Sequence, residues 1–364
     1  MLISLVPLIS FFVSALCASL FMPRLLQFCK RRGLYDMPNE RKVHTSKIPR
    51  LGGALFMPCA MIGIAAALIY MMLMELELPE FTASSVLIFI GIFLIYLIGL
   101  LDDVLGLSAR IKFLIQFVAS LFLPICNLYF NNLYGFMGIY ELPMWVGYPL
   151  TVFVCLLIVN SINLIDGIDG LASGLSIIAL AAFTFLFYRL EVMNYAMFSM
   201  GLMGAVIVFF YFNMFGKVDK CTKTFMGDTG SLILGYGLSY LAIKLAMDND
   251  AVLPYRPAAL LMSYSLLVVP TFDLIRVALL RLKKGVSIFH ADKTHIHHKF
   301  LNAGLSMHQS LIAILGLQIL ICAINILLNK LDINISLIVG LDILLFSAVQ
   351  IWLSRIIKKK QLLK

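Results

Sequence analysis

Residues 145–170 read WVGYPLTVFVCLLIVNSINLIDGIDG, an apolar run that ends in a polar segment. The run over 145–162 is long enough to cross a lipid bilayer as a helix. The segment that closes it carries polar side chains at three-residue spacing: Asn160, Asn163, Asp166 and Asp169. Ionisable groups at membrane depth are costly and commonly mark a functional site. This stretch therefore predicts a membrane-spanning helix that ends at a site for a polar ligand or a cation.

The rest of the chain has the same apolar character. Its 364 residues are 62% hydrophobic and 13% charged, with a mean hydropathy of +0.99. These values exclude a soluble domain and indicate a multi-span membrane protein. Residues 2–23 lack the basic start and the cleavage site of a secretory signal, so we interpret them as a retained span. Eleven apolar runs are candidate spans: 2–23, 51–74, 83–101, 113–130, 145–162, 171–188, 193–212, 230–247, 257–280, 309–328 and 333–354.

The basic residues predict how these spans are oriented. If the N-terminus lies outside, all of the 28 Lys and Arg residues except Arg189, Lys244, Arg256 and Lys330 fall on one side of the membrane. The positive-inside rule makes that side cytoplasmic. We therefore expect an all-α integral protein of the inner membrane, with one membrane-embedded domain over 1–364. Its C-terminus and its working face would lie in the cytoplasm.

The same distribution limits the classes of partner. The net charge of +9 is explained by the topology and by contact with anionic membrane lipid, so no nucleic-acid partner is expected. The seven cysteines show no CxxC spacing, and most lie within apolar runs. They are typical of small buried hydrophobic residues rather than of a disulfide framework or a zinc site.

Two adjacent carboxylates, Asp102 and Asp103, close the third span. Negative charges at a helix C-terminus oppose the helix dipole. A metal ion, a cationic group or a shared proton would relieve that cost. The alternative is a stop-transfer pair whose charges are matched by Arg110 or Lys112.

The polar segment after residue 160 is predicted to leave the helix. Residues three apart fall short of a full helical turn, so four of them cannot share one narrow face. Gly167 and Gly170 indicate that the helix ends near Asp166. We expect Asn160 and Asn163 on the last turn, with Asp166 and Asp169 lining the turn that follows. The alternative is that Asp169 only caps the next span.

Residues 225–231, FMGDTGS, enter the eighth span. An Asp between glycines at a helix N-terminus resembles a phosphate or metal cradle, because the N–H groups and the dipole favour anions. Mg²⁺ is commonly held by one or two carboxylates together with substrate phosphates. Phe225 could stack on a planar base. The alternative is simple capping by Asp228 or Ser231.

Residues 290–298, HADKTHIHH, hold four of the six histidines in a loop after the ninth span. Their spacing does not match the HExxH zinc helix. A cationic loop that clamps phosphate fits better, and a merely solvated basic loop is the alternative. The basic segment over 41–53 suits either function or positive-inside flanking, and Asp273 with Arg276 suits a structural ion pair.

The topology places all of these segments at one membrane face, although they are distant in the sequence. Carboxylates and amides suit a metal ion, and the basic loop suits a pyrophosphate. Phosphoryl transfer needs this combination, because positioning and charge neutralisation dominate its catalysis.

These motifs resemble the polyprenyl-phosphate N-acetylhexosamine-1-phosphate transferases, a membrane superfamily with WecA-like and TagO-like branches and, more distantly, MraY. The match runs in order from about residue 36 to 300. The histidine pattern is similar to the WecA and TagO branches. The resemblance implies that undecaprenyl phosphate attacks the β-phosphorus of a UDP-N-acetylhexosamine. UMP would leave, and the lipid-diphospho-sugar would initiate a cell-envelope polysaccharide.

The resemblance also implies roles for single residues. Asp228 and Asn163 would hold Mg²⁺, or alternatively Mn²⁺, with the pyrophosphate, while Asp102 and Asp103 would orient or deprotonate the lipid phosphate. Asp169 and Phe225 would contact uracil. Phosphate contact is implied for Lys112, Lys293, His295, His297 and His298. A substrate-binding role for Lys47 rests on a looser match to the family, because the length of the loop before Gly52 and Gly53 varies. Asn160, Asp166 and Asp292 are added to the substrate-binding residues as supporting residues.

Other functions fit the residues less well. A transporter of nucleotide-linked or lipid-linked sugars would place its charges near the membrane midplane, whereas these gather at the helix ends. The CDP-alcohol phosphotransferases begin their motif with Asp-Gly-x-x-Ala-Arg, which is absent here. The identity of the N-acetylhexosamine, the glycan pathway and homodimer formation are left open.

Overall fold

The computed structural model describes residues 2–36, 47–249, 252–287 and 294–362. Over these residues the chain forms thirteen α-helices, one short 3-10 helix η1 (Gly52–Leu55) and two small two-stranded sheets. Antiparallel pairs join β1 (Tyr35–Asp36) to β2 (Ile48–Pro49) and β3 (Asn132–Phe136) to β4 (Ile139–Glu141). The α-helices are α1 (Leu5–Arg32), α2 (Phe56–Leu73), α3 (Ala83–Leu105), α4 (Ala109–Ile125), α5 (Met144–Ile165), α6 (Leu171–Arg189), α7 (Met193–Phe215), α8 (Gly227–Ala246), α9 (Ala259–Ser265), α10 (Val268–Lys283), α11 (Ile296–Asn302), α12 (Met307–Lys330) and α13 (Ile335–Leu362).

The helices confirm the predicted all-α membrane architecture, and every predicted apolar run contains a helix. By length and composition, 9 helical segments of the described residues can cross a membrane. Helix α4 has only 17 residues. The run over 257–280 was predicted as one span, but it is divided between α9 and α10. Pro270 explains the break, because its ring lacks an N–H and blocks the carbonyl four residues earlier, that of Leu266.

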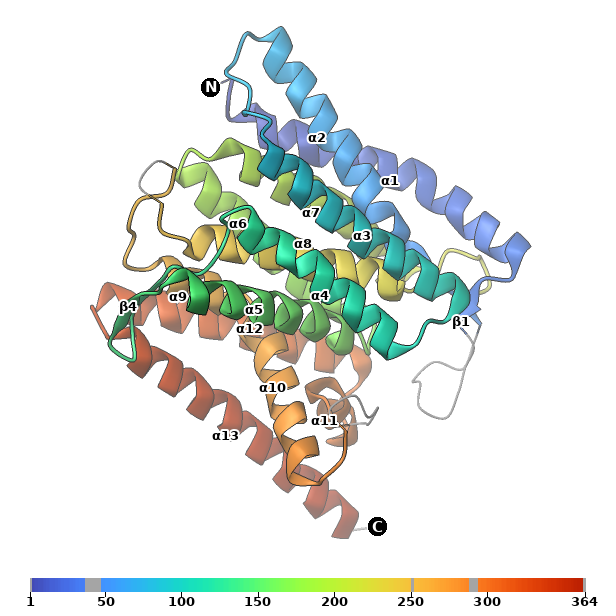
Figure 1. Cartoon of the computed structure of the whole chain (residues 1–364). Coiled ribbons are helices and arrows are strands. Elements are labelled where there is room, and N and C mark those ends of the chain that lie inside the picture. Colours follow the sequence, from blue (N-terminus) through green and yellow to red (C-terminus); the bar gives the residue numbers. More distant parts are fainter. Residues whose placement is uncertain (1, 37–46, 250–251, 288–293, 363–364) are drawn as a thin grey trace.

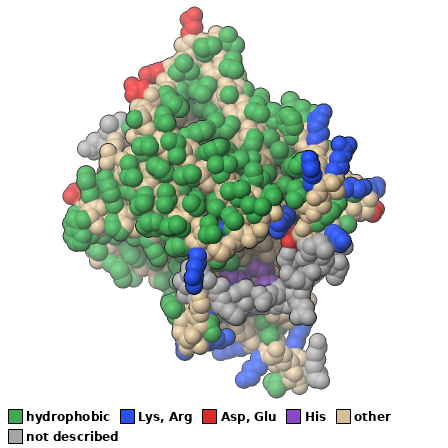
Figure 2. All heavy atoms as spheres, turned by 45° about the vertical axis from the view of Figure 1, so that its right-hand side comes forward, with side chains coloured by type: hydrophobic (Ala, Val, Ile, Leu, Met, Phe, Trp, Pro, Cys, Tyr) green, Lys and Arg blue, Asp and Glu red, His purple; other side chains and the backbone are tan. Residues whose placement is uncertain are grey.

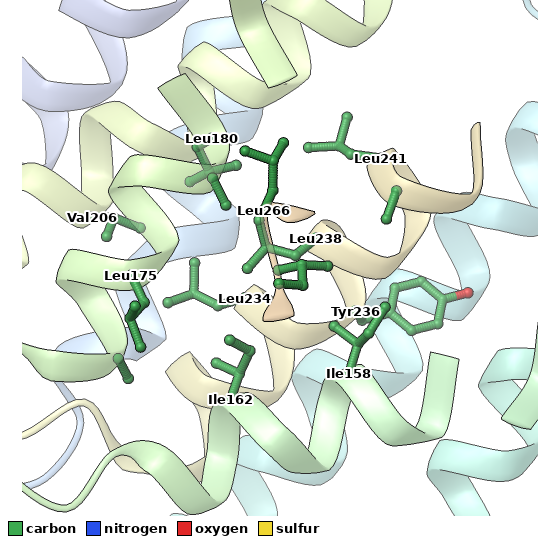
Figure 3. Packing of buried hydrophobic residues seen from close by; sticks show 14 of the residues in the cluster. Ile158, Ile162, Leu175, Leu180, Val206, Leu234, Tyr236, Leu238, Leu241 and Leu266 are labelled. Carbon is green, nitrogen blue, oxygen red and sulfur yellow. The ribbon is translucent and has the colours of Figure 1, made fainter. Parts of the chain in front are cut away.

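Helix α8 lies at the centre of the bundle, and α3, α5 and α6 pack around it (Figure 1). Of the apolar stretch of α8, 94% is buried inside the protein, whereas only 22% of the corresponding stretch of α3 is buried. Helix α3 therefore faces the surroundings of the protein, and α8 does not. Leu234 and Leu238 of α8 pack between α5 and α6 (Figure 3). Tyr236 of α8 donates a hydrogen bond to the carbonyl of Ala119 in α4.

Apolar and charged side chains occupy different parts of the surface, as in a protein that spans a membrane. Figure 2 shows a broad hydrophobic belt, with Lys and Arg gathered at one end of the molecule, and acidic side chains both at the opposite end and among the basic ones. Large apolar side chains are exposed along the belt, among them Phe12, Phe93 and Phe153. An apolar belt of this kind is stable against lipid rather than water. The basic end carries the polar loops that the sequence singled out.

The N-terminus of α8 is held by a close backbone contact with η1. The N–H of Gly53 donates to the carbonyl of Met226, at 2.9 Å. A Cβ on Gly53 would lie 2.6 Å from that carbonyl oxygen and would overlap the backbone of Gly230. Only glycine permits this approach.

Gly53→Ala should therefore destabilise the protein by about 1–3 kcal/mol, the usual cost of overpacking. Thermal unfolding in detergent measures the effect as a lower midpoint. Gly316→Ala is the control, because a Cβ on Gly316 meets nothing within 4 Å. Equal unfolding midpoints for the two variants would show that η1 and α8 can move apart to fit the added methyl group without loss of stability.

Candidate active site

An acidic cleft of about 410 Å³ opens where β1, β2, α3, α5 and α8 meet. Figure 2 shows a hollow near the basic end of the molecule, with histidine side chains within it. Six of the residues that line the cleft are aspartates: Asp36, Asp102, Asp103, Asp166, Asp169 and Asp228. Such a concentration of carboxylates suits a cationic ligand or an anionic substrate that brings cations with it.

Asp103 of α3 holds the first turn of α8. One carboxylate oxygen accepts the N–H of Asp228 at 2.9 Å. The other oxygen accepts the N–H of Thr229 at 2.9 Å and its hydroxyl at 2.6 Å. The Asp103 side chain is buried, and it occupies the end of α8 where the helix dipole favours negative charge. This geometry favours a positioning role for Asp103, since it fixes the backbone from which Asp228 projects.

Asp102, the neighbouring residue, faces Lys112 of α4. The Lys112 ammonium donates to Asp102 at 3.1 Å and to Asp228 at 2.5 Å. Pairing of Asp102 with Lys112, one of the two alternatives drawn from the sequence, is thus confirmed. The lysine joins α3 to α8 and neutralises part of the charge on two carboxylates. Its predicted contact with phosphate stays a prediction.

Asn163 and Asp228, the predicted metal ligands, lie side by side in the cleft. The Asn163 amide donates to Asp228 at 3.2 Å and to the Ser231 hydroxyl at 2.8 Å. The described residues contain no group of three His, Cys, Asp or Glu placed to share one metal ion. The protein therefore offers a carboxylate and an amide, which are hard oxygen donors but too few to complete a coordination shell.

Asn160, one turn earlier on α5, does not line the cleft. Its amide donates to the side chain of Gln116 and to the carbonyl of Leu156, at 2.9 and 2.8 Å. Both contacts turn it toward α4 and its own helix. Asn160 supports the packing of α5 against α4, and the geometry gives no support to a contact with substrate.

The turn after α5 carries two aspartates, as the spacing predicted. Helix α5 ends at Ile165, and Gly170 begins the approach to α6 with φ 76°. Asp166 is exposed and accepts no hydrogen bond from the described residues. Asp169 does not cap α6. It pairs instead with the ammonium of Lys223, at 2.5 Å.

Two residues that the sequence did not single out hold this turn in place. Asn213, near the end of α7, accepts the N–H of Gly170 at 2.7 Å and donates to Asp169 at 3.3 Å. Lys223 reaches the carbonyl of Asn213 as well as Asp169. The only available signal was that Lys223 stands two residues before Phe225. Phe225 lines the cleft, and its N–H donates to the carbonyl of Pro49 at 2.8 Å.

The histidine segment is anchored by Asp273 of α10. Asp273 pairs with Arg276 at 2.7 Å, which confirms the predicted ion pair. It also contacts the His295 ring at 2.8 Å and accepts the N–H of Ile296 at 3.0 Å. Arg276 in turn donates to the carbonyl of Thr294. The ion pair does more than join two residues of α10, because its two side chains also fix the start of α11.

The three histidines of this segment that the structure describes have different positions. His298 lines the cleft. His295 and His297 are buried, and a Cβ on Gly167 would overlap the His297 ring, so α11 docks on the turn after α5. Burial, together with the nearby His298 and His295, lowers the pKa of His297 to about 3, so this ring is neutral at pH 7.

Seven predicted site residues do not line the cleft or lie outside the described residues: Lys47, Lys112, Asn160, Asp292, Lys293, His295 and His297. His290, Asp292 and Lys293 lie outside the described residues. Lys47 is exposed and does not line the cleft. Arg50, three residues later, lines the cleft instead.

Comparisons with known proteins show what this chain is similar to. Residues 85–246 match the family described as Glycosyl transferase family 4. Over 346 residues the chain is 31% identical to the probable undecaprenyl-phosphate N-acetylglucosaminyl 1-phosphate transferase of Bacillus subtilis, covering 93% of this chain and 89% of that protein. The undecaprenyl-phosphate alpha-N-acetylglucosaminyl 1-phosphate transferases of Yersinia pestis and Escherichia coli K12 are 28% and 29% identical. Those two matches cover 82% and 86% of this chain, and 78% and 81% of the respective relatives.

Proposed function

We propose a function for this chain from one premise: it belongs to glycosyl transferase family 4. It transfers N-acetylglucosamine 1-phosphate from UDP-N-acetylglucosamine to undecaprenyl phosphate. The relatives are named for that sugar phosphate and that lipid, and the match covers most of both chains. The observation that carries the proposal is the convergence of Asp102, Asn163, Asp169 and Asp228 from three parts of the chain on one cleft. A cleft this acidic, next to a basic molecular end, suits a substrate with a pyrophosphate.

The reaction exchanges one phosphorus–oxygen bond for another. An oxygen of the lipid phosphate forms a bond to the β-phosphorus of the nucleotide sugar. The bond from that phosphorus to the bridging oxygen breaks, and UMP leaves with the oxygen and its electron pair. A phosphate monoester is already anionic near neutral pH, so it needs orientation more than deprotonation. We favour direct in-line attack over a phosphorylated aspartate for this reason.

Different residues in and around the cleft suit different parts of the nucleotide sugar. Asp169 and Phe225 both line the cleft and suit a uracil ring, with an acceptor for its N–H and an aromatic face for stacking. Asp102, Lys112 and Asp228 form a second group, with Lys112 able to exchange a carboxylate partner for a phosphate oxygen. His298 faces the same cleft and can donate to phosphate.

The oxygen donors fit Mg²⁺, with Mn²⁺ as an alternative. Asp228 and the amide of Asn163 would hold the ion, which commonly takes one or two carboxylates and completes its shell with phosphates and water. When bound, it would neutralise charge on the pyrophosphate. Without such a cation, six aspartates would repel a doubly phosphorylated substrate.

The chain is a multi-pass membrane protein, and we place it in the cytoplasmic membrane of a bacterium. The cleft lies at the end where Lys and Arg gather (Figure 2), which the positive-inside rule assigns to the cytoplasm. UDP-sugars are soluble cytoplasmic compounds, so this orientation gives the cleft access to both substrates. Labelling Cys221, an exposed cysteine in the loop after α7, with a membrane-impermeant thiol reagent tests the orientation.

UMP release tests the proposed reaction. Purified protein with undecaprenyl phosphate, Mg²⁺ and UDP-N-acetylglucosamine should release UMP in an amount equal to the lipid product. UDP-N-acetylgalactosamine and UDP-glucose define the sugar specificity. Omission of the lipid should give no UMP, whereas one equivalent per protein would indicate a phosphorylated aspartate. Absence of UMP with every UDP-N-acetylhexosamine would contradict the proposed function.

A further inference from the structure

Arg50 is a cation in the acidic cleft whose side chain has no partner among the residues that the structure describes. Its side chain lines the cleft, and its Nε is buried without a hydrogen-bond partner. No hydrogen bond or ion pair joins its guanidinium to any residue that the structure describes. A buried donor left unsatisfied is costly, and it is tolerated where a ligand satisfies it.

The backbone around Arg50 is held rigidly against the segment that leads to Asp228. The carbonyl of Pro49 accepts the N–H of Phe225 at 2.8 Å and the hydroxyl of Thr224 at 3.0 Å. The N–H of Gly52 donates to the carbonyl of Phe225 at 3.0 Å. Arg50 lies between these contacts, and its own carbonyl lies against Gly227. Its side chain therefore starts from a fixed point next to the first turn of α8.

The two lysines that reach the cleft residues are already committed to carboxylates. Lys112 contacts Asp102 and Asp228, and Lys223 contacts Asp169. Arg50 differs from both, because no aspartate of the cleft neutralises it in the part of the chain that is described. The guanidinium of Arg50 therefore keeps a positive charge that an anionic ligand in the cleft can neutralise.

We propose that the guanidinium of Arg50 binds a phosphate group in this cleft. The inference rests on the proposed function, which supplies two phosphate sources: the pyrophosphate of the nucleotide sugar and the phosphate of the lipid. Arg presents a planar fork of N–H donors that matches two phosphate oxygens at once. Lys47, the basic residue that the sequence favoured in this segment, is exposed and cannot fill this role from outside the cleft lining.

Kinetics of Arg50→Gln, with Arg50→Lys beside it, test the inference. Loss of a charge-assisted bidentate contact should raise one KM by about 10- to 100-fold. Arg50→Lys keeps the charge without the fork, so its KM should fall between those of wild type and Arg50→Gln. Arg31→Gln is the matched control, because Arg31 is exposed at the end of α1 and should leave both KM values unchanged.

The two phosphate sources are separated by measuring each KM with the other substrate saturating. A higher KM for UDP-N-acetylglucosamine alone assigns Arg50 to the pyrophosphate, and a higher KM for undecaprenyl phosphate alone assigns it to the lipid. Either result supports the inference. Inhibition by uridine, which has no phosphate, should be equal in wild type and Arg50→Gln.

Thermal unfolding distinguishes phosphate binding from a structural role. Removing an unsatisfied buried donor should leave the unfolding midpoint of Arg50→Gln equal to that of wild type, or higher. Unchanged kinetics in Arg50→Gln would overturn the inference, as would an activity loss that follows a lower midpoint and is not partly restored by lysine. If the wild type releases no UMP, the proposed function fails separately. Titration of inorganic pyrophosphate with Mg²⁺ then tests Arg50 alone, and equal affinity in wild type and Arg50→Gln would overturn it.

Discussion

Asp228→Asn should reduce the rate of UMP release by about a thousandfold. Asp228 is the carboxylate on which Lys112 and Asn163 converge, at 2.5 and 3.2 Å. An amide at this position removes the negative charge and places an N–H₂ group against these donors. The loss of one preorganised charged group at a reacting phosphate has an effect of about 10²–10³ in rate. If Asp228 holds Mg²⁺ as proposed, loss of this ligand would add to the effect.

The variant should fold normally, because Asp103 bonds the backbone N–H of Asp228 and not its side chain. Asp219→Asn is the matched control, since Asp219 is exposed in the loop that precedes the same motif. UMP release, its Mg²⁺ dependence and the unfolding midpoint are measured for all three proteins. If Asp228→Asn retained turnover with an unchanged Mg²⁺ requirement, Asp228 would not be the metal ligand.

The local parts of this site could be predicted from the sequence. The end of α5 near Asp166 followed from the three-residue spacing and from Gly167 and Gly170. The cluster at the start of α8 followed from an Asp flanked by glycines. Both are short-range signals, because helix geometry and glycine conformation act within a few residues. The eleven apolar runs were equally local signals, and among the described residues nine of them form helices that can cross a membrane. The two others are the run that contains α4, a helix of 17 residues, and the run that Pro270 divides.

The parts that depend on distant contacts could not be predicted. Asp273 was expected only to pair with Arg276, yet it also fixes His295, twenty-two positions further along the chain. Lys47 was assigned to the site by the family resemblance, and the sequence does not show which side of an extended segment faces a cleft. Residues three apart in an extended chain point to opposite sides. The side that faces inward was decided by the pairing of Pro49 and Gly52 with Phe225.

The adjacent aspartates Asp102 and Asp103 should respond differently to substitution, although the sequence assigned both to catalysis. Asp103→Ala leaves the N–H groups of Asp228 and Thr229 without an acceptor in a buried position. Each orphaned donor costs about 1–3 kcal/mol. We therefore expect Asp103→Ala to lower the unfolding midpoint in detergent and to reduce UMP release, since α8 no longer presents Asp228 correctly.

Asp102→Ala should reduce UMP release with little change in the unfolding midpoint. Asp102 accepts the N–H of Leu107 and one contact from Lys112, and Lys112 keeps Asp228 as a partner when Asp102 is removed. Asp103→Asn gives a further comparison, because its amide oxygen can still accept the N–H of Asp228 or that of Thr229. Its unfolding midpoint should therefore lie between those of Asp103→Ala and wild type. Equal midpoints for Asp102→Ala and Asp103→Ala would contradict the assignment of Asp103 to the α8 terminus. A shared loss of activity alone would instead place both carboxylates against the substrate, as the sequence resemblance implied.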